Sequence, residues 1–393
     1  MPEPGNSVKG DRSYNEGMAK IPDVLVLGGG IIGLTSAYYL AKAGLRVEVI
    51  DRGEMGREAS WAGAGILPPA GRSAGNPIDA LRRDTVRAFP VLTTLLKMRT
   101  GIENGWTVCG GIEVEDGETA HARAVWDADG IRYRKIGPER LAEMEPNLRT
   151  HGRTSYHFPG FAQVRNPRHL RALVAACPLG GIALTPRCHL TEWEIGGGRV
   201  AGIRDASGTL RVADHYLIAC GAWAEALLRP LGCPLGIHPV RGQIALYRPA
   251  EPLLTRVILD GKRYLVPRGD GRILVGSTEE PEAGFVKATT PEGEADLRNF
   301  AESWVPALAR ATLETSWAGL RPTSRDGLPS IGRVPGQDRV FAAVGHGRAG
   351  IQLSIGTARL IVDMIAGKTP PAYADAFRLD RPPTANVRPA FRS

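Results

Sequence analysis

Hydrophobic and polar positions follow two different patterns along the chain. Near the start, the uninterrupted apolar run Val24–Leu27 predicts a strand buried on both faces of a parallel sheet. The small, mostly apolar stretch 34–43 predicts a helix, and 46–51 predicts a second strand. From residue 239 onward apolar and polar residues alternate, and the turn Asp270-Gly271 between two such runs predicts an antiparallel hairpin. The chain therefore combines a parallel α/β part with an antiparallel part.

Further elements surround these two patterns. Helices are predicted at 79–98, 292–305 and 351–365, and buried strands at 216–220 and 340–344. Pro90 is expected to kink or divide the first of these helices. Residues 105–150 have mixed α+β character, so this segment is expected to leave the first domain.

A glycine motif follows the first strand. Gly28, Gly30 and Gly33 have the spacing that allows a tight turn, the approach of the backbone to a pyrophosphate, and close packing of helix on strand. Asp51 ends the second strand, where its carboxylate can accept hydrogen bonds from ribose hydroxyls. The uncharged stretch 24–41 is about as long as a membrane span, but three consecutive glycines and two tyrosines argue against one. The motif therefore predicts a bound dinucleotide.

Composition narrows the function classes. The net charge of +8 comes from scattered arginines with interleaved acids and no Lys/Arg run, so a small anionic ligand is expected rather than nucleic acid. The five cysteines are odd in number and form no Cys-x-x-Cys pair. We therefore expect a reducing, cytoplasmic compartment, no disulfide framework, no metal site, no secretory signal and no integral membrane segment.

Several motifs together resemble one family. They are the glycine motif, the loop Ala-Ser-Trp-Ala-Gly-Ala-Gly-Ile-Leu at 59–67, Tyr-Leu-Val-Pro-Arg at 264–268, Trp-Ala-Gly-Leu-Arg-Pro at 317–322 with Asp-Gly at 326–327, and Gly-His-Gly-Arg at 345–348. In combination they resemble the D-amino acid oxidase (DAO) superfamily of FAD-dependent oxidoreductases, and within it the glycine oxidase family of thiamine biosynthesis. The resemblance extends in order from about residue 24 to residue 381.

The resemblance implies an α/β fold in which a Rossmann-like FAD-binding domain of the GR2/DAO type is interleaved with an antiparallel-sheet α+β substrate domain. Residues 21–104, 151–235 and 318–380 are assigned to the FAD-binding domain, and residues 105–150 and 236–317 to the substrate domain. The polar residues 1–20 are expected to form a mobile leader. Residues 381–393, rich in proline and arginine, are expected to be a disordered tail.

The resemblance also implies noncovalent FAD and a set of residues around it. These are Gly28, Gly30, Ile31, Ile32 and Gly33 at the pyrophosphate; Asp51 and Arg52 at the adenosine; Ala59, Ser60, Ala64, Gly65 and Ile66 on the path to the flavin; Arg187, through its backbone, on the adenine side; Gly221; and His346, Gly347, Arg348, Ala349, Gly350, Ile351 and Gln352 around the pyrimidine edge of the flavin.

Three residues are implied to hold the substrate. Arg321 matches the family's carboxylate clamp, and a guanidinium suits that role because it can hold a planar carboxylate by two parallel hydrogen bonds. Arg348 matches a second active-site arginine, and Tyr264 matches a tyrosine whose hydroxyl helps to close the pocket.

The implied reaction is FAD-dependent oxidative deamination of glycine to the imine and glyoxylate, with sarcosine and small D-amino acids as alternative substrates. Oxygen would be the second substrate and hydrogen peroxide a product, and the imine would supply thiazole synthesis for thiamine. Lys262 stands near a position where one branch of glycine oxidases carries histidine, so a different polarity of the pocket is expected. The segments 105–150 and 241–264 are implied to govern substrate size and are the least motif-like parts, so glycine, sarcosine and small D-amino acids all stay open. A homotetramer is a further expectation from the resemblance. The alternatives are a D-amino acid dehydrogenase that passes electrons to a quinone and a non-catalytic flavin-binding protein.

Overall fold

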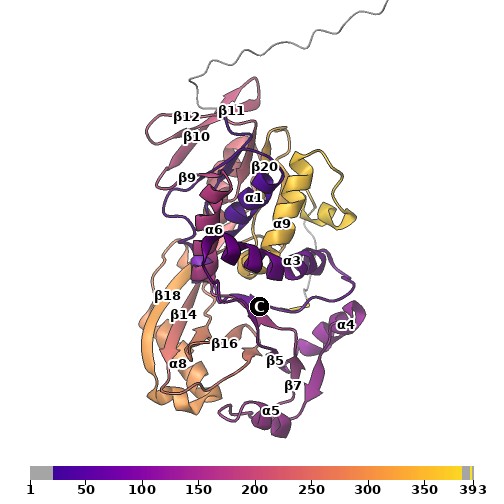
Figure 1. Cartoon of the computed structure of the whole chain (residues 1–393), viewed down its shortest axis with the longest axis vertical. Helices are drawn as coiled ribbons and strands as arrows, with labels where there is room; N and C mark the ends of the chain where they lie inside the picture. Colours follow the sequence, from indigo (N-terminus) through magenta and orange to yellow (C-terminus); the bar gives the residue numbers. More distant parts are fainter. Residues whose placement is uncertain (1–20, 383–389, 392–393) are drawn as a thin grey trace, which may run out of the picture.

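The computed structural model describes residues 21–382 and 390–391, which form two large sheets and two small ones (Figure 1). The predicted leader 1–20 lies outside the described residues. Within these two described ranges, no helix is long and apolar enough to cross a membrane.

The first sheet has six strands in the order β19-β20-β13-β1-β2-β9. Their bounds are Ser330–Arg333, Val340–Val344, His215–Ile218, Val24–Leu27, Val47–Ile50 and Ala183–Thr185. All neighbours are parallel except β19, which pairs antiparallel to β20 at one edge. Every residue of β1 and β20 is buried, as the continuous apolar runs predict.

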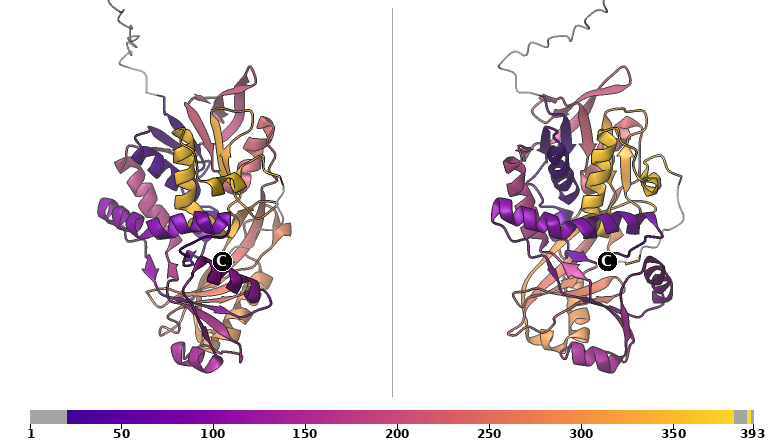
Figure 2. Two further views of the ribbon diagram at one scale, coloured as in Figure 1. Left: turned by 90° about the vertical axis from the view of Figure 1, so that its right-hand side faces the viewer. Right: turned by 45° about the vertical axis from the view of Figure 1, so that its right-hand side comes forward.

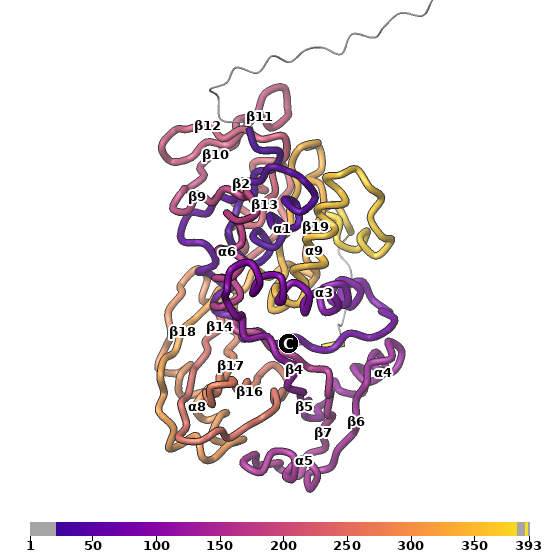
Figure 3. Tube along the Cα trace, viewed as in Figure 1, coloured from indigo at the N-terminus to yellow at the C-terminus, as the bar shows by residue number. Residues whose placement is uncertain are grey.

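Both faces of this sheet are covered. Val24 and Val26 of β1 face a layer of four helices: α1 (Ile31–Lys42), α3 (Pro77–Thr100), α6 (Asn166–Leu179) and α9 (Gly350–Ile365). Of these, α1 packs against both α6 and α9 (Figures 1 and 3). Leu25 and Leu27 face the opposite layer, made by the small sheet of β10 (Leu190–Gly196), β11 (Arg199–Asp205) and β12 (Leu210–Arg211) together with α7 (Ala224–Leu228).

The second sheet has eight strands in the order β18-β14-β17-β16-β15-β5-β7-β6. Their bounds are Thr312–Thr323, His238–Arg248, Ile273–Gly276, Arg263–Pro267, Val257–Asp260, Gly111–Val114, Ser155–Phe158 and Arg134–Ile136. The sheet is antiparallel except for β5, which pairs parallel with β15. Leu265 packs with the helices α5 (Pro138–Met144) and α8 (Pro291–Trp304), whereas Tyr264 and Val266 face the opposite side.

Short elements and one long helix connect the two sheets. A second small sheet pairs β3 (Ile66–Leu67), β8 (Ala162–Gln163) and β4 (Thr107–Val108). The helix α2 (Ala59–Ala62) precedes it, and α4 (Thr119–Asp129) lies in the segment that leads to β6. The helix α3 lies across the junction between the sheets (Figure 2). It continues through Pro90 as one helix, so of the two expected effects of this proline, a kink or a division, the division does not occur. Phe89 and Leu92 are buried beside the proline, and this packing offsets the lost helical hydrogen bond.

Two boundary predictions differ from the structure. Strand β7 belongs to the eight-stranded sheet, although 151–235 was assigned to the FAD-binding domain. The predicted disordered tail is wrong for Ala390 and Phe391, because both are buried in an aromatic core beside β7. Residues 383–389 and 392–393 of that tail lie outside the described residues.

Candidate active site

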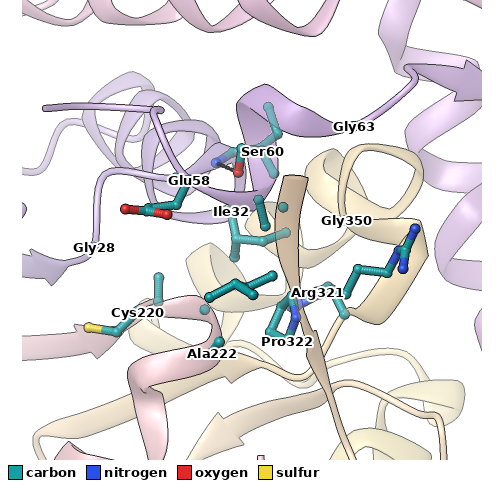
Figure 4. A pocket seen from close by; sticks show the side chains of 18 of the residues that line it. Gly28, Ile32, Glu58, Ser60, Gly63, Cys220, Ala222, Arg321, Pro322 and Gly350 are labelled. Carbon is teal, nitrogen blue, oxygen red and sulfur yellow. Dashed lines mark hydrogen bonds between the residues drawn. The ribbon is translucent and has the colours of Figure 1, made fainter. Parts of the chain in front are cut away.

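A long cleft lies between the carboxyl ends of β1, β2 and β13 and the facing side of the eight-stranded sheet (Figure 4). Gly28, Asp51 and Gly221 line it from the first sheet, and Tyr264 and Arg321 line it from the second. Ligands of open α/β sheets bind just beyond the carboxyl ends of the strands. The cleft is therefore placed where a dinucleotide is expected, with one end in the second sheet.

The glycine turn is built so that no side chain obstructs it. Gly28 has φ +114°, and a Cβ there would lie 2.5 Å from the carbonyl oxygen of Ala219. A Cβ on Gly33 would lie 1.8 Å from the carbonyl oxygen of Gly28, so helix and turn touch directly. No side chain caps α1, and its first turn carries no acidic residue; the Ile31 N–H donates to Ser60 Oγ at 2.9 Å. This helix N-terminus is suited to a pyrophosphate.

Asp51 fixes the adjoining loops. Its Oδ2 accepts a hydrogen bond from the Gly29 N–H at 2.7 Å, and its Oδ1 accepts one from the Gly53 N–H at 2.8 Å. Each carboxylate oxygen has a second lone pair, which leaves room for a ribose hydroxyl. Next to it, the Arg52 guanidinium lies 3.6 Å from the centroid of the Trp223 ring, so residues that follow β2 and β13 meet at this end of the cleft.

A second helix N-terminus faces the cleft from the other side. Gly350 and Ile351 begin α9 and line the cleft, and α9 has no side-chain cap and no acidic residue in its first turn. The preceding His346 is buried and shares a 3.0 Å hydrogen bond with Thr357 Oγ1. Burial lowers the pKa of His346 to about 3, so this ring is neutral at physiological pH. The imidazole therefore adds no positive charge at this helix N-terminus.

Arg321 occupies the end of the cleft on β18. Its Nη1 donates to the carbonyl oxygen of Thr278 at 3.2 Å and to that of Arg241 at 3.5 Å, and its Nη2 donates to Ser277 Oγ at 2.6 Å. A side-chain hydrogen bond also links the guanidinium to Tyr264. The guanidinium lies against Gly242, where a Cβ would be 2.1 Å from Nη2.

Tyr264 and Arg348 lie beside this guanidinium. The Tyr264 ring lies over Gly276 of the neighbouring strand, and its hydroxyl is adjacent to Arg321. Arg348 lies in the turn before α9, and its Nη2 donates to the carbonyl oxygen of Lys262 at 2.5 Å. Burial and then the charge of Arg348 lower the pKa of Arg321, although an arginine stays protonated in a protein. The three implied substrate residues thus converge at one end of the cleft.

Comparison with known proteins agrees with this geometry. A family model described as FAD dependent oxidoreductase (DAO) matches residues 23–364. The chain belongs to this family. It is 39% identical over 365 residues to the glycine oxidase of Pseudomonas aeruginosa, covering 91% of this chain and 99% of that protein. It is 33% identical to the bifunctional protein ThiO/ThiG of Synechocystis, covering 95% of this chain and 57% of that protein. The crystal structure of glycine oxidase from Geobacillus kaustophilus matches with a TM-score of 0.85 at 31% identity, over 94% of this chain and 99% of that chain.

The cofactor of this FAD dependent oxidoreductase family fits the cleft. Gly28 and Gly33 leave the backbone clear for a pyrophosphate at α1. Asp51 follows β2, the strand next to β1, and accepts a hydrogen bond from Gly29 of the same turn. The second helix N-terminus, at Gly350, faces the opposite end, near Arg321. An FAD would therefore lie with its adenosine near Asp51 and its flavin between α9 and β18.

Most of the residues implied to contact FAD line the cleft. The lining includes Gly28, Gly30, Ile31, Ile32, Asp51, Arg52, Ala59, Ser60, Ala64, Gly65, Ile66, Gly221, His346, Gly347, Arg348, Gly350, Ile351 and Gln352. Three implied residues are not part of the lining. Gly33 packs behind the turn, Ala349 lies between two lining residues, and Arg187 is exposed and pairs with Glu54 at 2.6 Å. The next three residues, 188–190, line the adenosine end instead.

Other members of the site carried no signal in the sequence pattern. Trp223 follows a strand as an isolated aromatic residue, and nothing in the spacing indicates that it meets Arg52. Lys262 forms an ion pair with Glu279, with Nζ to Oε2 at 2.6 Å, beside the two active-site arginines. Burial opposes ionisation of Glu279, but its bond to Lys262 and the nearby arginines outweigh burial and lower its pKa. The two residues are 17 positions apart, so only the β16–β17 pairing reveals the contact.

Proposed function

We propose that this protein is an FAD-dependent oxidase of small amino acids, with glycine as its main substrate. One observation carries the proposal. The guanidinium groups of Arg321 and Arg348 and the side chain of Tyr264 lie close together at the end of the cleft that would hold the flavin. Similarity to glycine oxidases over nearly the whole chain supports the same assignment.

Binding of the substrate carboxylate follows from the hydrogen bonds of Arg321. Its Nη1 is held by two carbonyl oxygens and its Nη2 by Ser277, so the guanidinium cannot swing away from its position. The Nε–H and second Nη2–H form a fork that matches both oxygens of a carboxylate. The Tyr264 hydroxyl, next to that fork, is placed to hydrogen-bond one of the same oxygens. This arrangement fixes both the position and the angle of the amino acid.

The same cations act on the substrate amine. Arg321 carries the carboxylate, while Arg348 adds a second positive charge nearby. A neighbouring positive charge disfavours an ammonium group, so the bound substrate loses a proton from its amine more readily than it does in water. The neutral amine is the form that can release a hydride from its α-carbon.

Orientation supplies the rest of the chemistry. When bound, FAD supplies the two-electron acceptor, taking the hydride and later reducing oxygen to hydrogen peroxide. The protein aligns the α-carbon with the cofactor, and such alignment can contribute roughly 7–11 kcal/mol to a barrier. With loss of the amine proton, the hydride transfer gives the imine, which water hydrolyses. The overall reaction is glycine plus oxygen plus water to glyoxylate, ammonia and hydrogen peroxide.

A substrate panel tests the proposal. Purified protein with bound FAD is mixed anaerobically with glycine, sarcosine, D-alanine or D-proline, and bleaching of the flavin absorbance is followed. Bleaching by glycine, with equimolar peroxide and glyoxylate once oxygen is admitted, is the expected result. Bleaching without oxygen consumption but with turnover of a quinone would assign a dehydrogenase instead. A flavin that no amino acid reduces would refute the proposal and leave a non-catalytic flavin-binding protein.

The setting of the reaction is part of the same proposal. The relative named ThiO/ThiG joins a region similar to this chain to further sequence, which supports a role in supplying thiazole synthesis for thiamine. We place the protein in the cytoplasm, as a homotetramer. Removal of the protein from its cell should create a requirement for thiazole, and sedimentation of the purified protein should give four times the mass of 42.1 kDa.

A further inference from the structure

The last described residues of the chain lie in the protein interior. Ala390 and Phe391 are each 2% exposed. The centroid of the Phe391 ring lies 5.8 Å from that of Trp126, 5.2 Å from that of Phe158 and 5.3 Å from that of Phe161. Aromatic pairs at such separations stabilise a core beyond the area that they bury. The ring near the C-terminus is therefore a core residue of the second sheet.

Hydrogen bonds hold the backbone of this segment from two sides. The Ala390 N–H donates to Asp79 Oδ2 at 2.9 Å, and Trp126 Nε1 donates to the Ala390 carbonyl oxygen at 2.7 Å. Arg82 Nη2 reaches the Phe391 carbonyl oxygen at 3.4 Å. Asp79 and Arg82 belong to α3, whereas Trp126 belongs to α4. The two residues thus join a helix of the first layer to the core of the second.

Arg82 continues this connection into the cofactor cleft. It is 2% exposed and forms an ion pair with Asp79. Its Nε donates to Gln352 Oε1 at 3.1 Å, and Gln352 lines the cleft from the first turn of α9. A buried cation needs all of its partners, because removal of one leaves charge without compensation. The position of the Gln352 amide therefore depends on Arg82, and that of Arg82 depends on Asp79 and the Phe391 carbonyl.

We propose that the C-terminal pair Ala390–Phe391 is a wedge that positions the FAD site through Arg82. Arg82 is then a positioning residue: it touches neither FAD nor substrate, and it fixes Gln352 beside the flavin. The match to the family model covers residues 23–364, so Ala390 and Phe391 lie outside the matched range. The inference rests on FAD binding in the cleft and not on the identity of the amino acid substrate.

Cofactor measurements on the full chain test this proposal. The dissociation constant of FAD, its absorption spectrum in the protein and its midpoint potential are compared for the unchanged chain, Phe391→Ala, Arg82→Met and the double variant. Each single change should weaken FAD binding about tenfold, as for the loss of one charge-assisted hydrogen bond, and should alter the flavin bands. Because both act along one path, the double variant should bind FAD no more weakly than the worse single variant. Arg82→Lys keeps the positive charge but loses the forked arrangement of N–H donors, so its FAD dissociation constant should lie between those of the unchanged chain and of Arg82→Met.

Matched controls separate positioning from general destabilisation. Phe300→Ala removes another buried ring, in α8, and should lower Tm without changing the FAD constant or spectrum. Arg87→Met removes an exposed arginine from the same helix as Arg82, and it should leave Tm, the FAD dissociation constant and the flavin spectrum unchanged. If Phe391→Ala does not fold, Phe391→Leu gives the same comparison. The proposal is overturned if the Phe391 variant loses stability as Phe300→Ala does while its FAD constant, spectrum and potential stay unchanged. None of these measurements uses an amino acid substrate. They therefore test the role of Phe391 and Arg82 even if the protein does not oxidise glycine.

Discussion

Replacement of Arg321 by methionine is the most direct test of the substrate site. The change keeps the volume of the side chain but removes the Nε–H and Nη2–H fork that we assign to the carboxylate. A hydrogen bond to a charged group contributes about 1.5–3 kcal/mol, so loss of two costs ~3–6 kcal/mol. At about 1.4 kcal/mol per factor of ten, kcat/KM for glycine should fall roughly 10²- to 10⁴-fold. Arg321→Lys keeps the positive charge but loses the forked arrangement of N–H donors, so its kcat/KM for glycine should fall by a smaller factor than that of Arg321→Met.

The assay separates binding of substrate from the redox step. Anaerobic stopped-flow reduction of the flavin at increasing glycine gives an apparent Kd and a limiting rate. The apparent Kd should rise steeply while FAD content stays unchanged, because the partners of Arg321 lie on β14, on β16 and in the loop after β17, away from the glycine turn. Arg248→Met, at the exposed end of β14, is the control and should leave both values unchanged. An Arg321→Met protein with unaltered apparent Kd, or one that loses FAD, would refute our placement of the carboxylate.

Three further predictions test neighbouring parts of the site. In Gly242→Ala the new Cβ would lie 2.1 Å from Arg321 Nη2, so kcat/KM should fall about tenfold or more while FAD stays bound. Steady-state kinetic constants equal to those of the unchanged protein would show that Arg321 does not depend on this close contact. Lys262→Met should raise KM for glycine roughly two- to fivefold, because Glu279 loses its ion pair and then competes with the substrate carboxylate for Arg321 and Arg348. In the double variant with Glu279→Gln, KM should return toward its original value. A KM that stays high would show that Glu279 does not cause the rise. The free energy of unfolding should fall as pH decreases from about 6.5 toward 3, because the unfolded chain protonates His346 while the folded chain, with its pKa at about 3, keeps it neutral. Denaturant titrations of His346→Gln should show a weaker pH dependence over that interval, and an identical slope would exclude this residue as a source.

The local elements were predictable because their causes are local. The turn after β1 needs Gly28 and Gly33 five residues apart, and the contact between Gly33 and the Gly28 carbonyl closes within that same segment. The apolar runs of β1 and β20 needed no knowledge of their neighbours to be recognised as buried strands. Pro90 does not divide α3, because the effect of a proline inside a helix also depends on the side chains packed around it.

The substrate site was reached from the sequence only through resemblance to a family. No spacing rule relates Tyr264, Arg321 and Arg348, since they lie on different strands and a helix turn that meet by folding. The pattern likewise gave no sign of the ion pair of Lys262 with Glu279, which requires the register of β16 against β17.

What the sequence by itself determined is the dinucleotide turn, the parallel and antiparallel styles of the two sheets, and the elements that build them, because short-range periodicity and backbone freedom decide these. What only the tertiary structure decided is which distant side chains meet. Arg82 and Gln352 are 270 positions apart, and Phe391 packs against the rings of Trp126, Phe158 and Phe161. Such contacts form because the same buried space must be filled and every buried charge paired, and that requirement acts on the folded chain as a whole.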